Sequence, residues 1–220
     1  AFNTFEEALA ISREVSDRVG EGQVISNMAG VYLDQGRYID ALNTYEEALA
    51  IRLEISDRVG EGQTLNNMAG VYLAQGRYLN ALNTYEEALA IYLKIDDQAG
   101  EGSTLNNIAR VYQEQGYYAE ALNTFEEALA IYRELGNQAG EGTTLNNIAG
   151  IDFAQGRYIE ALVTYNEALA IISELGDRAG EGATLNNIAL VFKTQGRYTE
   201  ALSIFEEALA ISIEVGDRTG

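Results

Sequence analysis

The sequence predicts an all-α protein, a solenoid of about eleven helices in five and a half repeats of 40 residues. Three observations support this. Glu-Ala-Leu-Ala-Ile recurs every 40 residues, Gly-Glu-Gly recurs at the same spacing, and so does Gln-Gly followed two residues later by Tyr. The glutamates that begin the first string are Glu7, Glu47, Glu87, Glu127, Glu167 and Glu207.

The first helix of each repeat is predicted from the spacing of its apolar residues, and the second full repeat serves as the example. Its apolar residues fall at i, i+3, i+4 and i+7: Leu65, Met68, Ala69 and Tyr72. This spacing places them on one face of a helix. Asp57 precedes the segment as an N-cap, and Gly76 is expected to end the helix.

The second helix of the repeat also has a single apolar stripe, formed by Tyr78, Ala81, Leu82, Tyr85, Ala88 and Leu89. It is expected to end near Ile95. Each repeat is then two helices of about 18 residues, and their short connection makes them antiparallel neighbours. We predict one solenoid domain over 1–220, consisting of a half repeat at 1–15 and helix pairs at 18–55, 58–95, 98–135, 138–175 and 178–215.

Small residues predict close packing between these helices. Ala69, Ala81 and Ala88 recur in register, and alanine allows two helix axes to approach closely. Gly60 and Gly62 fall in the first turns of a helix, where each glycine costs about 1 kcal/mol relative to alanine. Because this unfavourable choice of glycine recurs in every repeat, we expect a close contact with a neighbouring helix at these positions. The chain begins and ends on a second helix without an obvious polar cap, so end-to-end self-association is also expected.

The composition excludes several classes of function. The net charge of −20 and the pI near 4.2 disfavour nucleic acids and anionic membranes, and favour a neutral to basic protein or peptide partner. The chain has neither His nor Cys and no singular cluster of other reactive groups, so we expect no enzyme, metal or cofactor. No stretch approaches the roughly 18 apolar residues of a membrane span, and no secretory signal opens the chain. We therefore expect a cytoplasmic protein.

The repeat motif resembles the tetratricopeptide repeat family. The residues that carry the resemblance are Leu65, Met68, Ala69, Tyr72, Gly76, Tyr78, Ala81, Tyr85 and Ala88. The usual period of that family is about 34 residues, and its helix pair often ends in proline, which this chain lacks. The longer repeat, with Gly-Asp-Arg-x-Gly-Glu-Gly before Thr-Leu-Asn-Asn, is similar to kinesin light chain, the LGN/Pins spindle scaffolds and long-repeat proteins of cyanobacteria. The resemblance implies a right-handed superhelix whose concave face, lined by the first helices, holds an extended peptide.

Recurring amides are the candidate binding residues. Gln63, Asn66 and Asn67 project opposite the apolar stripe of their helix. Asparagine pairs recur at Asn66-Asn67, Asn106-Asn107, Asn146-Asn147 and Asn186-Asn187, with Ser26-Asn27 in the first full repeat. An amide supplies one acceptor and two donors, which suits the backbone of an extended peptide. We expect the first asparagine of each pair to face a ligand; the second either does the same or bridges neighbouring helices.

Residues that differ between repeats are the candidates for specificity. Arg110 stands where three of the other repeats have glycine and lies beside Gln113, and Phe153 stands where the first two full repeats have leucine. Arg110 is expected either to bind a carboxylate of a partner or to pair with Glu114, four residues later. The leading hypothesis is a peptide-binding scaffold. The alternatives are a solenoid that self-assembles through its ends, and a duplicated, consensus-like segment without a single ligand.

Two sets of acidic residues need separate explanations. Glu-Glu pairs such as Glu86-Glu87 lie away from the apolar stripe of the second helix, so we expect a solvated face and not a catalytic pair. Asp152 occupies a position that is aromatic in the other repeats. Because a buried unpaired carboxylate is costly, we predict that Asp152 is partly exposed or has a hydrogen-bonded partner.

Overall fold

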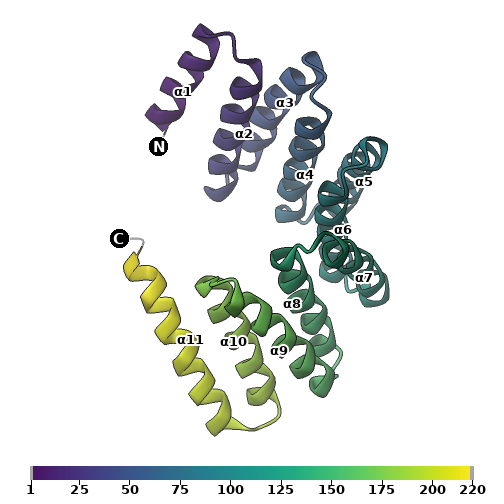
Figure 1. Cartoon of the computed structure of the whole chain (residues 1–220), viewed down its shortest axis with the longest axis vertical. Coiled ribbons are helices and arrows are strands. Elements are labelled where there is room, and N and C mark those ends of the chain that lie inside the picture. Colours follow the sequence, from purple (N-terminus) through teal and green to yellow (C-terminus); the bar gives the residue numbers. More distant parts are fainter. Residues whose placement is uncertain (1, 219–220) are drawn as a thin grey trace. The chain divides into compact units, whose positions relative to one another are not determined.

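The computed structural model describes residues 2–218, and over this range it contains eleven α-helices and no strand (Figure 1). The predicted all-α class is confirmed. The helices are α1 (Phe2–Glu14), α2 (Arg18–Asp34), α3 (Tyr38–Glu54), α4 (Arg58–Ala74), α5 (Tyr78–Ile95), α6 (Gln98–Glu114), α7 (Tyr118–Leu135), α8 (Gln138–Ala154), α9 (Tyr158–Glu174), α10 (Arg178–Thr194) and α11 (Tyr198–Arg218). Even-numbered helices are the first helices of the repeats, and odd-numbered helices are the second. Within the described range, no helix has the length and apolar character needed to cross a membrane.

Each first helix begins directly after a residue whose side chain caps it. The backbone N–H of Gly60 donates to Asp57 Oδ1 at 2.9 Å, which satisfies one of the N–H groups that a helix start leaves unpaired. The predicted cap at Asp57 is confirmed. The same contact recurs at Asp17, Asp97, Asn137 and Asp177.

The helices end in turns that require left-handed backbone. Beyond α4, Gly76 adopts a φ of +68°, which glycine reaches without the steric cost of a Cβ, and its N–H donates to Leu73 O at 2.8 Å. The predicted end at Gly76 is confirmed. The turn after α5 places Asp96 at a φ of 58°, whereas the corresponding turn after α7 uses Gly136 at 64°.

The chain forms two compact units, with α1–α6 in residues 1–115 and α7–α11 in residues 116–220. In the first unit, α2 packs on α3 and α4 packs on α5 within their repeats, while α3 also contacts α4 and α5 contacts α6. The second unit repeats this pattern from α7 to α11. Within a unit, a first helix such as α4 therefore packs between two second helices. Whether the chain is one solenoid domain stays a prediction.

The helices approach closely through alanines, as predicted. Ala69, Ala81 and Ala88 have no exposed surface, and Tyr85 is buried beside them. Because alanine has the smallest side chain with a Cβ, larger side chains from neighbouring helices fill the space between the axes.

Glycine creates a second kind of close contact. A Cβ on Gly62 would lie 2.7 Å from Tyr92 Cζ, and one on Gly100 would lie 2.3 Å from Tyr92 Cδ1. Tyr92 thus sits between the glycines of two successive first helices, which confirms the predicted close contact. We call the residue at this position of each second helix the slot residue. The slot residues are Ser12, Arg52, Tyr92, Tyr132, Ile172 and Ser212.

Candidate functional site

A shallow depression of about 310 Å³ in the first unit is lined by polar side chains from three helices. Its lining residues are Gln63, Asn66 and Asn67 of α4, Tyr92 of α5, and Ser103 and Asn107 of α6. None of these side chains is charged at neutral pH. We call this set the amide depression.

Helix periodicity explains why these side chains meet. Gln63, Asn66 and Asn67 stand at i, i+3 and i+4 and share one face of α4. Leu65 and Met68, each 7% exposed, occupy the buried face. Because α6 repeats this pattern beside α4, the polar faces of the two helices border one surface.

Asn66 joins the two first helices directly. Its Nδ2 donates to Thr104 Oγ1 at 2.8 Å, and that hydroxyl donates to Gly100 O at 2.7 Å. The Asn66 Oδ1 atom is enclosed and has no hydrogen-bond partner in the described chain. In this pair the bridge between neighbouring helices is therefore made by the first asparagine.

The remaining amides of the depression are open to a ligand. Gln63 and Asn67 are exposed, and Asn107 is half-buried. Their donors and acceptors lie along one surface of α4 and α6. The arrangement suits a ligand that presents several backbone amide groups in a row.

Tyr92 and Ser103 belong to the depression but were missed from the sequence. Burial raises the pKa of the Tyr92 hydroxyl, and the neighbouring Asn66 amide lowers it by less. The phenol thus stays neutral near neutral pH, as both donor and acceptor. Two sequence features could have identified Tyr92. The slot residue varies between repeats although it directly follows the constant Glu-Ala-Leu-Ala-Ile, and the recurring Gly-Glu-Gly indicates a close contact with a neighbouring helix. Ser103 stands at the repeat position of Gln63 and was missed because its residue type differs.

The second unit arranges its asparagines differently. Asn187 Nδ2 of α10 donates to Asn146 Oδ1 of α8 at 3.4 Å, so these predicted residues are brought together. Asn147 is half-buried, whereas Asn186 is exposed beside α11. Asn106, on α6 of the first unit, is also half-buried.

The predicted specificity residues lie in distinct environments. Arg110 is exposed on α6. Burial raises the pKa of Tyr85 to about 12, and the nearby positive charge of Arg110 acts in the opposite direction. Among the described residues, no ion pair joins Arg110 to Glu114. Gln113 is half-buried on the same helix. Phe153 is partly buried against a core cluster, with its ring centroid 6.0 Å from that of Tyr158.

The acidic residues behave as predicted. Asp152 is 8% exposed, and Arg157 Nε donates to its Oδ1 at 2.9 Å, so the predicted hydrogen-bonded partner is confirmed. Glu86 and Glu87 are exposed, as expected for a solvated face. Among residues 2–218, no group of three or more acidic, His or Cys side chains is placed to hold a metal ion.

Comparison with protein families gives one match along most of the sequence. The model described as tetratricopeptide repeat matches residues 1–54, 60–134 and 140–214. No curated protein matches the chain in sequence at a significant level.

Solved structures resemble the fold. BtubC (BKLC) of P. vanneervenii has a TM-score of 0.80 at 23% identity, over 97% of this chain and 90% of its own. The nearly identical TPR-like repeats of a protein described as a kinesin light chain of Podosopora anserina have a TM-score of 0.68 at 20% identity, covering 89% and 96%. The Rap conjugation gene regulator of plasmid pLS20, in complex with the Phr* peptide, has a TM-score of 0.79 at 18% identity, covering 94% of this chain and 57% of the regulator. At these identities the likeness shows the fold.

Proposed function

This chain belongs to the tetratricopeptide repeat family, and from that premise we propose that it is a protein-interaction scaffold whose amide depression binds an extended peptide. The observation that carries the proposal is the set of uncharged polar side chains from three helices around one depression. A scaffold of this kind binds through contact and preorganisation, and the proposal includes no catalytic step.

The chemistry of the depression favours recognition of peptide backbone. Asn67 and Asn107 stand at the same position of successive repeats, and Gln63 lies one turn before Asn67. An extended peptide presents N–H and C=O groups at regular intervals, and amide side chains complement both. Backbone recognition makes binding largely independent of the peptide's side chains. We propose the same role, within their own units, for the predicted amides Asn106, Asn146, Asn147, Asn186 and Asn187.

Charge narrows the class of peptide. The lining of the depression is neutral, while the whole chain carries a net charge of −20. A neutral or basic peptide therefore approaches more readily than an acidic one. Arg110, exposed on α6 beyond Asn107, is proposed to contact a carboxylate of the bound peptide, with Gln113 beside it. Phe153 is proposed to contribute to specificity in the second unit.

The structural neighbours add support from outside the chain. The Rap conjugation gene regulator was solved in complex with the Phr* peptide, so a fold of this type accommodates a peptide. The structural likeness to the repeats of a kinesin light chain agrees with the resemblance of the 40-residue repeat to that group of proteins.

The test is selection of neutral and basic peptides from a random display library, followed by titration calorimetry. The double variant Asn67→Ala/Asn107→Ala should bind the selected peptides about 10-fold more weakly, because two hydrogen bonds of roughly 0.5–1.5 kcal/mol each are lost. Asn83→Ala is the matched control, since Asn83 is an exposed asparagine outside the depression. Equal affinity of the double variant and wild type would reject the site. Failure to select any peptide would count against peptide binding itself.

A further inference from the structure

Two positions of the repeat vary together, one on the first helix and one on the second. In three of the five full repeats the first position is glycine and the second is tyrosine, whereas the other two combine a larger residue with phenylalanine. The glycine pairs are Gly30 with Tyr45, Gly70 with Tyr85 and Gly150 with Tyr165, and the other pairs are Arg110 with Phe125 and Leu190 with Phe205. The second helix thus has a hydroxyl at this position only where the first helix has no side chain.

In the first unit, the glycine of each pair lies beside the tyrosine hydroxyl. A Cβ on Gly30 would lie 3.7 Å from the Tyr45 hydroxyl oxygen, and a Cβ on Gly70 would lie 3.7 Å from that of Tyr85. Apart from the glycines' own sequence neighbours, no other side chain of the described residues comes within 4 Å of either Cβ. We call these two places the hydroxyl windows: Gly30 with Tyr45, and Gly70 with Tyr85.

Packing of the fold requires neither the glycine nor the hydroxyl of a window. Alanine would fit at Gly70, because 3.7 Å is an ordinary van der Waals distance, and glycine is the less favourable residue inside a helix. Phenylalanine also fits in place of the tyrosine, since Phe125 has no exposed surface at the same repeat position. The recurrence of both residues together therefore points to a role outside packing.

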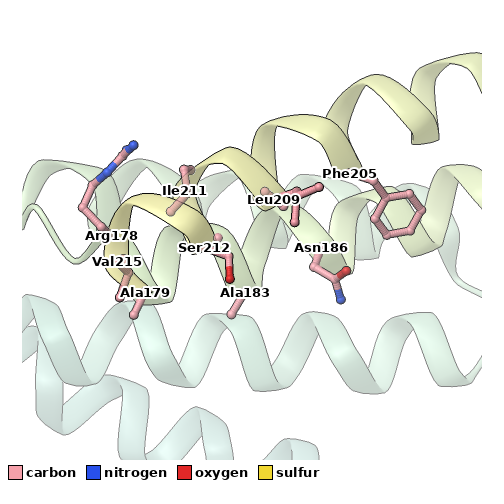
Figure 2. A pocket seen from close by; sticks show the side chains of 11 residues that line it. Arg178, Ala179, Ala183, Asn186, Phe205, Leu209, Ile211, Ser212 and Val215 are labelled. Carbon is pink, nitrogen blue, oxygen red and sulfur yellow. The ribbon is translucent and has the colours of Figure 1, made fainter. Parts of the chain in front are cut away.

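The fifth repeat shows which surface this ring position borders. Figure 2 shows Phe205 of α11 and Asn186 of α10 around a groove of about 460 Å³. Asn186 has the repeat position of Asn66, and Leu190 follows it by one helical turn. The ring position thus lies next to the face of the first helix that carries the recurring asparagines.

The hydroxyl groups of both windows have no hydrogen-bond partner among the described residues. Their residues are nevertheless part of the core, since Tyr45 is 3% exposed and Tyr85 is 2% exposed. In the described part of the chain, the enclosed side-chain atoms without a partner are Arg52 Nε and Asn66 Oδ1, so the two tyrosine oxygens reach the surface. Because an unpaired hydroxyl is less favourable in a core than no hydroxyl, these groups are placed to bind a partner from outside the chain.

Both phenols are neutral near neutral pH. Burial raises the pKa of Tyr85 to about 12, and burial together with the nearby charge of Asp34 raises the pKa of Tyr45. A neutral hydroxyl donates one hydrogen bond and accepts others, so it can bind either the C=O or the N–H group of a peptide. The adjacent glycine allows the backbone of a ligand to approach the helix closely.

The windows lie on the same helix faces as the proposed peptide site. Asn67 precedes Gly70 by one turn of α4, so the second window continues the amide depression. Gly30 has the corresponding position on α2, and α2 contacts α4. Helices in contact lie about 8–10 Å apart, and an extended peptide rises about 3.3 Å per residue, so about three residues lead from one window to the other. The row ends at α6, where Arg110 takes the glycine position.

We propose that the bound peptide crosses α2 and α4 at the two hydroxyl windows, where the hydroxyls of Tyr45 and Tyr85 form hydrogen bonds with its backbone. About three residues of extended peptide separate the two contacts. This inference rests on the proposed function and gives the ligand of that site a path and a spacing. Because the windows bind backbone groups, the ligand class is an extended peptide segment whose side chains at the two crossings do not determine binding.

The first test needs no selected ligand. Its probe is an acetylated and amidated octapeptide of alternating glycine and serine, added to protein that carries ¹³C at Cζ of every tyrosine. The variants Tyr45→Phe, Tyr85→Phe and Tyr78→Phe assign three signals, and Tyr78 is the control because it is half-buried and lies beside neither glycine. The signals of Tyr45 and Tyr85 should shift saturably at millimolar probe, and that of Tyr78 should stay in place. If either window gave no shift up to about 20 mM probe, the proposal would be overturned.

The second test separates binding from a structural role of the hydroxyls. Tyr45→Phe/Tyr85→Phe should bind the probe about 10-fold more weakly, because two hydrogen bonds are lost. Its melting temperature should equal or exceed that of wild type, since two unpaired hydroxyls are removed. A clearly lower melting temperature would assign the hydroxyls to the fold and reject the proposal.

Gly70→Leu tests the path of the peptide. It places at the second window the residue that the fifth repeat has in Leu190. The probe should then no longer shift the Tyr85 signal, while the Tyr45 signal still responds. A Tyr85 signal that shifts as in wild type would show that the peptide does not cross α4 at Gly70.

Peptides selected from the display library distinguish this inference from the proposed function. Weaker binding by Asn67→Ala/Asn107→Ala, together with unchanged binding by Tyr45→Phe/Tyr85→Phe, would keep the peptide site and reject the windows. Weaker binding by both double variants would support the site and the path. Unchanged binding by both would reject the two together.

Discussion

The residue at position 152 contacts the arginine that lies five residues later, and the equivalent arginine of another repeat contacts an aromatic ring instead. In the second full repeat, the Arg77 guanidinium lies 4.6 Å from the centroid of the Tyr72 ring, a cation–π contact. In the fourth, Asp152 replaces the ring and the equivalent Arg157 pairs with its carboxylate. Both arrangements use the same arginine at the start of a second helix, so the fold tolerates the exchange of an aromatic residue for an acid.

Replacing Asp152 with tyrosine should raise the melting temperature by about 2–4 °C, corresponding to about 1 kcal/mol. The change removes a buried carboxylate, which is 8% exposed, and restores the cation–π contact. Thermal unfolding followed by circular dichroism measures the effect. Arg157→Ala should destabilise wild type more than it destabilises Asp152→Tyr, because it leaves the carboxylate unpaired only in wild type. A lower melting temperature for Asp152→Tyr would contradict the assigned register.

At the level of the helix, two of the three glycines of α4 have different surroundings. A Cβ on Gly62 would approach Tyr92 Cζ to 2.7 Å, whereas a Cβ on Gly70 would lie 3.7 Å from the Tyr85 hydroxyl oxygen, an ordinary contact. Tyr92 is 2% exposed, so its ring has little room to move. Helix propensity favours alanine at both positions. Any difference in stability between Gly62→Ala and Gly70→Ala should therefore come from packing.

Gly62→Ala should destabilise the protein by about 1–3 kcal/mol, the usual cost of overpacking. Gly70→Ala should stabilise it by about 0.5–1 kcal/mol through helix propensity and reduced freedom of the unfolded chain. Chemical denaturation of both variants against wild type measures the difference. If Gly62→Ala were as stable as Gly70→Ala, the slot around Tyr92 would not be a rigid contact.

At the scale of the whole molecule, each compact unit has core clusters of its own. In the first unit, Tyr85 packs with Ile108 and Val111 of α6. In the second, Tyr165 packs with Ile188 and Val191 of α10. Repeat proteins are stabilised mainly by contacts between neighbouring repeats. Each unit therefore contains many of the contacts that stabilise its own helices.

The fragment 1–115, which spans the first unit, should therefore fold into helices on its own, with a lower melting temperature than the full chain because it has fewer packed neighbours. Circular dichroism and thermal unfolding provide the measurement. The fragment 1–97 is the control: it lacks α6 and so uncovers Tyr85, and it should be less stable than 1–115. A disordered 1–115 would show that the unit depends on the rest of the chain.

Much of the fold was predictable because its determinants are local. The spacing of Leu65, Met68 and Tyr72 predicts a helix, and Asp57 and Gly76 predict its ends. The candidate site was predictable only in part. The amides of α4 and α6 were found, but Tyr92 reaches the depression from α5, and a projection of the first helix alone does not include it.

The sequence by itself determined the repeat, the helices, their caps and the family, because these depend on residues a few positions apart and on a period repeated along the chain. Only the tertiary structure decided that Asn66 binds Thr104 of the next first helix and that two glycines enclose Tyr92. The physical reason is the same in each case. These contacts depend on the register and separation of packed helices, which are set by the combined fit of many side chains, and the spacing of residues along one helix does not identify the two partners of such a contact.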